Sequence, residues 1–321
     1  MTVHSPAAVL LAVATGALVL AVCCDVAVAE IPEYDLNFNI TKGEGTVKVF
    51  VSPDELETMM ESEKGVTLLD AREAPGPLAV LANRRTESIP GSYHAHWTDF
   101  IVEGTRDTLQ SVEELEGLFR ERGVSNDVPV VVYGVWTEGW GEEGRIFWQL
   151  HWLGHQQAYI LYGGVFAWNT SDHEGRGRTA DGDFVAKPID DRIIDADQLK
   201  KRLDTEPQNL VVLDARTIAE YEGAQLYGEE RGGHVPGAVQ FEWKRVFAED
   251  GSGNLKNSSK LKEELMEIGV ADDVAIVTYC TGGIRSSFLY SVLTWLGYED
   301  VTNYAASWWD WASREDLPIS D

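Results

Sequence analysis

Residues 275–287, with the sequence AIVTYCTGGIRSS, place a cysteine between a predicted strand and a predicted helix. The run 274–279 is short, mostly apolar and rich in β-branched residues, which favours a buried strand. The pattern over 288–297 is helical, so Cys280 lies at the carboxyl end of the strand. In open α/β sheets ligands bind at this end, where a helix N-terminus offers free N–H groups to an anion. The sequence therefore predicts a thiol that ionises.

The loop after the cysteine has the composition needed to stabilise a thiolate. A free cysteine has a pKa of about 8.5, and lowering it requires positive potential nearby. Two glycines permit a tight curl of backbone N–H groups around the sulfur, and Arg285 adds a full charge. The candidate binding loop comprises Thr281, Gly282, Gly283, Ile284, Arg285 and Ser286. The alternatives are an ordinary Gly-Gly turn and a buried core cysteine.

Composition narrows the classes of partner. The chain has 321 residues, 44% of them hydrophobic, and a formal net charge of -27. Such a charge repels nucleic acid and anionic membrane surfaces. His94 and His96 stand near each other, but no cysteine or carboxylate framework at zinc spacing accompanies them. We therefore expect no metal, no cofactor and no nucleic-acid partner.

The N-terminus resembles an export signal. Residues 7–22 are almost continuously apolar, and Ala27-Val28-Ala29 has the form of a signal-peptidase site. We interpret residues 1–29 as a secretory signal, which predicts a periplasmic or extracellular protein. An uncleaved membrane anchor and a lipoprotein signal using Cys23 or Cys24 remain alternatives.

Removal of this segment would leave one cysteine. Cys23 and Cys24 both lie inside the predicted signal, so Cys280 would be alone in the mature chain. A single cysteine forms no internal disulfide. An unpaired thiol in an exported protein is a candidate reactive group.

A series of short sequence motifs occurs twice in the chain, in the same order. LLDAR at 68–72 is answered by VLDAR at 212–216, and four further pairs follow in the same order, with separations of 142 to 146 residues. This spacing indicates an internal duplication. We place a first copy at 45–170, a linker at 171–188 and a second copy at 189–321. Gly134 stands in the first copy where Cys280 stands in the second.

Each copy alternates strand-like and helical segments. The segment 52–60 begins with Ser-Pro and turns acidic, as the start of a helix does, and 195–203 begins likewise with aspartate and ends basic. Strands separated by helices at this spacing imply βαβ units. The expected fold is α/β, with a central, mainly parallel sheet flanked by helices in each copy.

These features together resemble the tandem-domain rhodaneses, sulfurtransferases of the thiosulfate and 3-mercaptopyruvate type. The motifs on which this resemblance rests are LDAR at 213–216, GGHVPGA at 232–238, CTGGIRS at 280–286 and SWWDW at 307–311. The resemblance covers roughly 45–321. It implies a catalytic second copy and a first copy that has lost its cysteine.

The resemblance also implies a reaction. The Cys280 thiolate takes the outer sulfur of a small anionic donor as a persulfide, which a thiol, cyanide or a protein acceptor then removes. Asp214, Arg216 and Glu220 are expected to support the loop. Glu220 departs from the tandem thiosulfate enzymes, which place a substrate-binding arginine there. The loop sequence matches neither well-known donor class.

Two other functions are open. One is a persulfide carrier or binding module that serves a partner protein. The other is a cysteine-dependent phosphatase, whose loop has five residues between cysteine and arginine where this chain has four. Whichever of these functions applies, the sulfurtransferase included, we expect the first copy to be a structural partner. Its aromatic residues would pack against the second copy and wall one side of the cleft: Trp136, Trp140, Phe147, Trp148 and Trp152.

Overall fold

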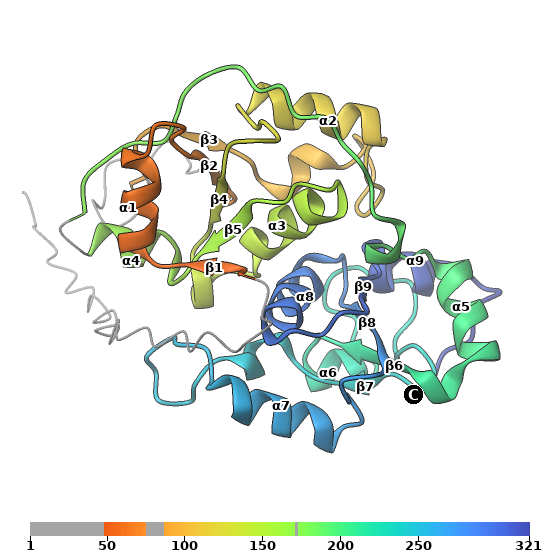
Figure 1. The fold of residues 1–321 in the computed structure, drawn as a ribbon. Helices are drawn as coiled ribbons and strands as arrows, with labels where there is room; N and C mark the ends of the chain where they lie inside the picture. Colours follow the sequence, from red (N-terminus) through yellow and green to blue (C-terminus); the bar gives the residue numbers. More distant parts are fainter. Residues whose placement is uncertain (1–47, 75–86, 171–172) are drawn as a thin grey trace, which may run out of the picture. The chain divides into compact units, whose positions relative to one another are not determined.

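The computed structural model describes residues 48–74, 87–170 and 173–321, which contain two parallel β-sheets with helices on both faces (Figure 1). The expected α/β fold is confirmed. The predicted signal at 1–29, with Cys23 and Cys24, lies outside the described residues. Within the described ranges, none of the helices combines the length and the apolar character that crossing a bilayer requires.

The first sheet has the strand order β1-β5-β4-β2-β3. Its strands are β1 (Phe50–Val51), β2 (Thr67–Asp70), β3 (Ser92–His94), β4 (Val130–Tyr133) and β5 (Ala158–Leu161). Alternate side chains enter opposite cores, because successive residues of a strand point to opposite faces. Val130 and Val132 pack with α2 (Val112–Glu121) and α3 (Glu142–Trp152), whereas Val131 and Tyr133 pack with α1 (Pro53–Glu61) and α4 (Gly164–Asn169).

The second sheet repeats this plan with the order β7-β6-β8-β9. Its strands are β6 (Leu210–Asp214), β7 (Val239–Gln240), β8 (Ala275–Tyr279) and β9 (Val301–Asn303). One face carries α5 (Ala196–Thr205) and α9 (Ser307–Ser313), and the other carries α7 (Ser258–Glu267) and α8 (Ile284–Leu296). A short helix, α6 (Ile218–Tyr221), follows β6.

Local sequence sets the helix starts. Ser52 caps α1 and Asp195 caps α5, each in a capping box with the residue three positions on. The helices predicted at 52–60 and 195–203 are therefore confirmed.

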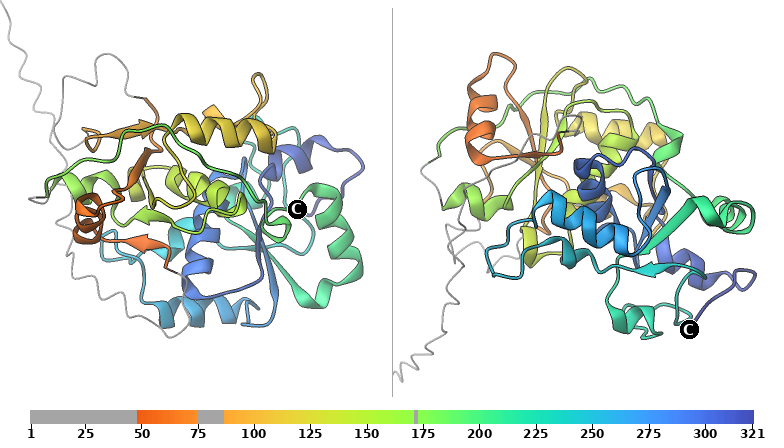
Figure 2. Two further views of the ribbon diagram at one scale, coloured as in Figure 1. Left: turned by 45° about the horizontal axis from the view of Figure 1, so that its top comes forward. Right: turned by 60° about the horizontal axis from the view of Figure 1, so that its bottom comes forward.

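The two copies share one core through α3 and α8, which lie side by side (Figures 1 and 2). Gly144 of α3 permits this approach, because a Cβ there would lie 2.7 Å from the backbone nitrogen of Phe288. Trp136 adds edge contacts with Phe247 and Phe288. Trp136 therefore packs against the second copy as predicted, and Trp140 likewise contacts Tyr227 of that copy.

The described part of the connecting segment, 173–188, runs along the first copy. Gly177 donates to the carbonyl of Pro90 at 2.8 Å, and Phe184 donates to that of Val124 at 3.0 Å. The Phe184 side chain is fully buried. This segment is therefore packed against the first copy, although its composition is that of a linker.

Candidate active site

Cys280 lies between the end of β8 and the start of α8, and its side chain is 1% exposed. The backbone N–H of Gly283 donates to its Sγ at 3.1 Å. The N–H of Cys280 itself donates to Ser307 Oγ at 3.1 Å, which ties the cysteine to the first residue of α9. The sulfur therefore faces the N-terminus of a 13-residue helix, where the dipole favours a negative charge.

Gly283 is the N-cap of α8 and has a φ of 83°, in the left-handed region that glycine tolerates. A Cβ there would collide with the carbonyl oxygen of Ala305 and would lie 2.5 Å from Nη1 of Arg145. The loop can therefore curl around the sulfur only with glycine at this position.

Gly283→Ala is expected to lower the free energy of unfolding by roughly 2–4 kcal/mol, because strain at positive φ adds to the backbone collision. Gly237→Ala is the matched control. Its φ is 78°, and a Cβ there meets nothing within 4 Å, so it should cost about 1 kcal/mol. Urea denaturation measures both variants. Equal costs would show that the crowding around Gly283 is unimportant.

Arg285 and Thr281 form a closed network with Glu220. The Arg285 guanidinium donates to both Glu220 carboxylate oxygens at 2.7 and 2.8 Å and to Thr281 Oγ1 at 2.6 Å. Thr281 Oγ1 donates to Glu220 at 2.8 Å. Burial raises the pKa of Glu220, but the hydrogen bonds and charge of Arg285 outweigh it and hold that pKa at about 2.

This pairing changes the role expected for Arg285. The sequence suggests a full charge available to an anion, whereas the structure pairs this charge with the fully buried carboxylate of Glu220. The guanidinium also lies over the rings of Trp140 and Tyr227, 5.2 and 5.7 Å from their centres. Glu220 thus lies where loop support is expected, and Arg285 forms part of the wall.

The surroundings favour the thiolate. Burial raises the pKa of the Cys280 thiol, but the charge of Arg285 and hydrogen bonds from Ser286 and Gly282 outweigh it, so that pKa lies below its ordinary value. The Ser286 hydroxyl donates its proton to Asn303 at 2.8 Å, which fixes the first turn of α8 to β9.

Cys280 opens into a cavity of about 270 Å³. Its walls come from both copies: Trp97, Trp140, Tyr227, Cys280, Thr281, Gly282, Ile284, Arg285 and Trp309. Sequence reasoning identified Trp140 as a wall residue but missed Trp97, Tyr227 and Trp309. Trp309 belongs to the repeated terminal motif SWWDW, and this repetition is the sequence feature that could have indicated its place at the site. The four aromatic residues of this wall limit the water that reaches the sulfur.

Asp214 and Arg216 lie beneath the site and not in the cavity. Arg216 donates to Asp214 through Nε at 2.9 Å and Nη2 at 2.6 Å, and both side chains are fully buried. Tyr279, the residue before the cysteine, donates its hydroxyl to Asp214 at 2.5 Å. The first copy repeats the pair with Asp70 and Arg72. This placement suits support of the strand end that carries Cys280.

Glu143 fills the equivalent position of the first copy. A Cβ at Gly134 would collide with the Glu143 carboxyl, which is fully buried. Burial, helped by Glu142, raises the pKa of Glu143 to about 8. A carboxyl that is mostly neutral at pH 7 therefore occupies the space where the second copy has its thiol.

Glu143→Gln is expected to stabilise the protein at neutral pH. The folded pKa of Glu143 lies above its unfolded value, so its contribution to stability is fully present below about pH 4.5 and is lost as the pH rises toward about 8. At pH 7.5 the free energy of unfolding of the variant should exceed that of the wild type by on the order of 2–4 kcal/mol. The free energy of unfolding of the variant should also depend less on pH between about 4.5 and 8. Chemical denaturation at pH 5, 6.5 and 8 tests it. Glu138→Gln, an exposed control, should change stability by less than about 0.5 kcal/mol.

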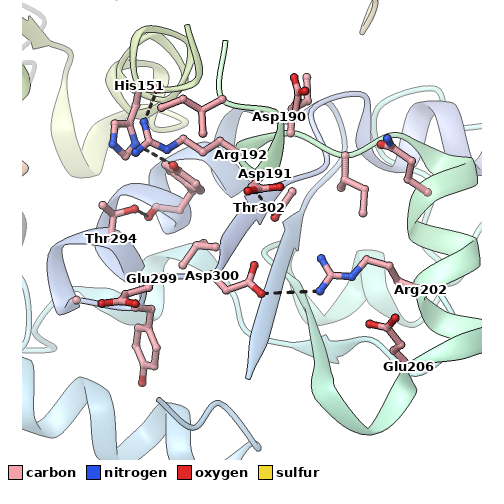
Figure 3. Close-up of a pocket in the computed structure, with 18 of the residues that line it drawn as sticks. His151, Asp190, Asp191, Arg192, Arg202, Glu206, Thr294, Glu299, Asp300 and Thr302 are labelled. Carbon is pink, nitrogen blue, oxygen red and sulfur yellow. Dashed lines mark hydrogen bonds and ion pairs between the residues drawn. The ribbon is translucent and has the colours of Figure 1, made fainter. Parts of the chain in front are cut away.

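A larger cavity, of about 1080 Å³, lies elsewhere and shares no lining residue with the first (Figure 3). The ring nitrogen Nδ1 of His151 forms a hydrogen bond with the Tyr290 hydroxyl at 2.8 Å. Arg192 donates a hydrogen bond to the backbone carbonyl of His151 at 2.5 Å. Arg202 forms a 4.0 Å ion pair with Asp300. Cys280 lines the smaller cavity and not this one, so the smaller cavity is the candidate active site.

Comparison with known proteins gives matches over both copies. The rhodanese-like domain family matches residues 52–171 and 195–314. A thiosulfate sulfurtransferase of Azotobacter vinelandii is 36% identical over 210 residues, 64% of this chain and 75% of the relative. The sulfur carrier protein TtuD of Thermus thermophilus is 30% identical over 291 residues, 85% and 96% of the two chains.

A solved structure is similar to this chain over most of its length. The crystal structure of SseA from Escherichia coli, described with the 3-mercaptopyruvate sulfotransferases, matches with a TM-score of 0.65 and 25% identity. The match covers 81% of this chain and 99% of that one.

Proposed function

The chain belongs to the rhodanese family as a sulfurtransferase of the thiosulfate and 3-mercaptopyruvate type, and we propose that it acts through a persulfide on Cys280. The observation that carries the proposal is the buried Cys280 sulfur. It accepts a hydrogen bond from the Gly283 N–H and lines a cavity that has four aromatic residues in its wall. The first copy, with Gly134 and Glu143 at the equivalent place, holds no thiol there.

The first half-reaction loads the cysteine. The Cys280 thiolate attacks the outer sulfur of the donor and forms an S–S bond, while the bond between that sulfur and the rest of the donor breaks. Thiosulfate then leaves as sulfite with the electron pair, and 3-mercaptopyruvate leaves as pyruvate after protonation of its enolate. The Gly283 N–H and the N-terminus of α8 stabilise the negative charge on the persulfide.

The second half-reaction returns the thiolate. Cyanide or a thiol attacks the terminal sulfur, the Cys280 S–S bond breaks, and its electron pair stays on Sγ. No outside oxidant or reductant is required.

The test combines mass and turnover. The purified protein is exposed to thiosulfate or to 3-mercaptopyruvate, its intact mass is measured, and thiocyanate is quantified after addition of cyanide. We expect a gain of one sulfur on Cys280 with at least one donor, followed by thiocyanate. Hydrolysis of an aryl phosphate without a sulfur adduct would favour the phosphatase alternative instead. For protein recovered from outside the cell, the same mass tests our proposal that residues 1–29 are removed on export.

The similarity to TtuD supports a second candidate, a carrier that passes its persulfide to a partner protein. A stable adduct on Cys280 with negligible thiocyanate formation would distinguish this carrier from the enzyme.

A further inference from the structure

Arg145 is a buried cation contributed by the copy that lacks the cysteine. It lies on α3 and is 1% exposed. Its Nη1 donates to the carbonyl oxygens of Gly283 at 3.2 Å and Ala305 at 3.4 Å. Its Nε and Nη2 are buried and have no hydrogen-bond partner among the described residues.

A buried charge of this kind is costly without a counter-charge. The ring of Trp148, 5.0 Å away, compensates it only in part. Burial lowers the pKa of Arg145 to about 10, while the negative charges of Cys280 and Asp107 oppose that shift. The guanidinium therefore remains charged at neutral pH, and the thiolate is one of the two anions that it faces.

The geometry links Arg145 to the sulfur through one residue. Nη1 contacts Gly283, and the N–H of Gly283 donates to Cys280 Sγ. The charged groups nearby include Asp107, which acts on Arg145 as described above, and Arg285 of α8 and Glu220 of α6, which are paired with each other. Arg145 therefore has no hydrogen-bonded carboxylate among the described residues, whereas Arg285 is held by Glu220.

We propose that Arg145 is a positioning residue that stabilises the anionic sulfur of Cys280, so that the cysteine-less copy supplies part of the charge on which the second copy depends. The guanidinium holds the Gly283 carbonyl at the first turn of α8 and places a positive charge behind the loop. The thiolate part of this proposal stands on the structure alone, and the persulfide part rests on the proposed function.

The experiment measures the Cys280 thiol pKa in the full chain. The rate of iodoacetamide alkylation at Cys280 is followed against pH by peptide mass spectrometry for wild type, Arg145→Met and Arg145→Lys. We expect the methionine variant to raise the thiol pKa by about one unit or more and the lysine variant to restore most of the difference. Turnover with the better donor should fall at least tenfold in Arg145→Met.

Arg192→Met is the matched control. Arg192 also donates to a backbone carbonyl across the two copies, that of His151, but lies at the larger cavity. It should leave the thiol pKa unchanged.

Melting temperature separates this role from a structural one. Removal of an unpaired buried charge should leave the Tm of Arg145→Met unchanged or higher. A folded Arg145→Met protein with the wild-type thiol pKa, or one that fails to fold, would overturn the proposal. Absence of thiocyanate from the wild-type protein would contradict the proposed function but would leave the shift in thiol pKa as a separate result.

Discussion

Replacement of Cys280 by serine is expected to lower sulfur transfer by about 10³-fold or more and to abolish the mass gain of one sulfur. The serine hydroxyl is not ionised near neutral pH, and an oxygen cannot form the persulfide. Its oxygen can still accept the Gly283 N–H, so the loop should keep its conformation. Thiocyanate formation and intact mass after exposure to the donor measure the two effects.

The control for this prediction is the double variant Cys23→Ser and Cys24→Ser, which removes the other two cysteines of the sequence. It should keep wild-type turnover. If Cys280→Ser retained more than about a tenth of the turnover, another group would have to accept the sulfur, and the assignment of Cys280 would be wrong.

Replacement of Glu220 by alanine is expected to lower the free energy of unfolding by about 3–5 kcal/mol. The change leaves the Arg285 guanidinium buried without its carboxylate and removes the acceptor of the Thr281 hydroxyl. The loss should be largest in the isolated protein, because no anionic ligand then compensates the buried charge of Arg285. Equilibrium urea denaturation at pH 7 measures it.

The dependence on pH gives this prediction a second measurement. The folded pKa of Glu220, about 2, lies below its unfolded value of 4.5. Its contribution to stability is therefore present above about pH 4.5 and is lost as the pH falls toward 2. Glu220→Gln should weaken this loss on acidification.

The matched control is Glu264→Ala. Glu264 accepts two hydrogen bonds from Lys256 at 2.9 Å, but its side chain is 20% exposed and lies away from Cys280. We expect a cost of about 1 kcal/mol and no change in turnover. If Glu220→Ala cost no more than this control, the buried network would not be a main support of the loop.

The sequence predicts the parts of this protein whose physical causes are local. Strand β8 follows from a run of apolar and β-branched residues, and the starts of α1 and α5 follow from capping residues. The place of Cys280 follows from the strand that ends before it. The duplication is visible because it repeats motifs at a steady interval, and it implies that Gly134 stands where the thiol would be.

The tertiary structure decides how charges pair across distant segments. Glu220 and Arg285 are 65 residues apart, and no local pattern indicates that the carboxylate neutralises the arginine. Arg145 and Gly283 are 138 residues apart and meet only because α3 packs against α8. The aromatic walls come from loops and helices of both copies. The sequence therefore determined the fold and the candidate nucleophile, whereas long-range packing determined how Arg145 and Arg285 are placed around the sulfur.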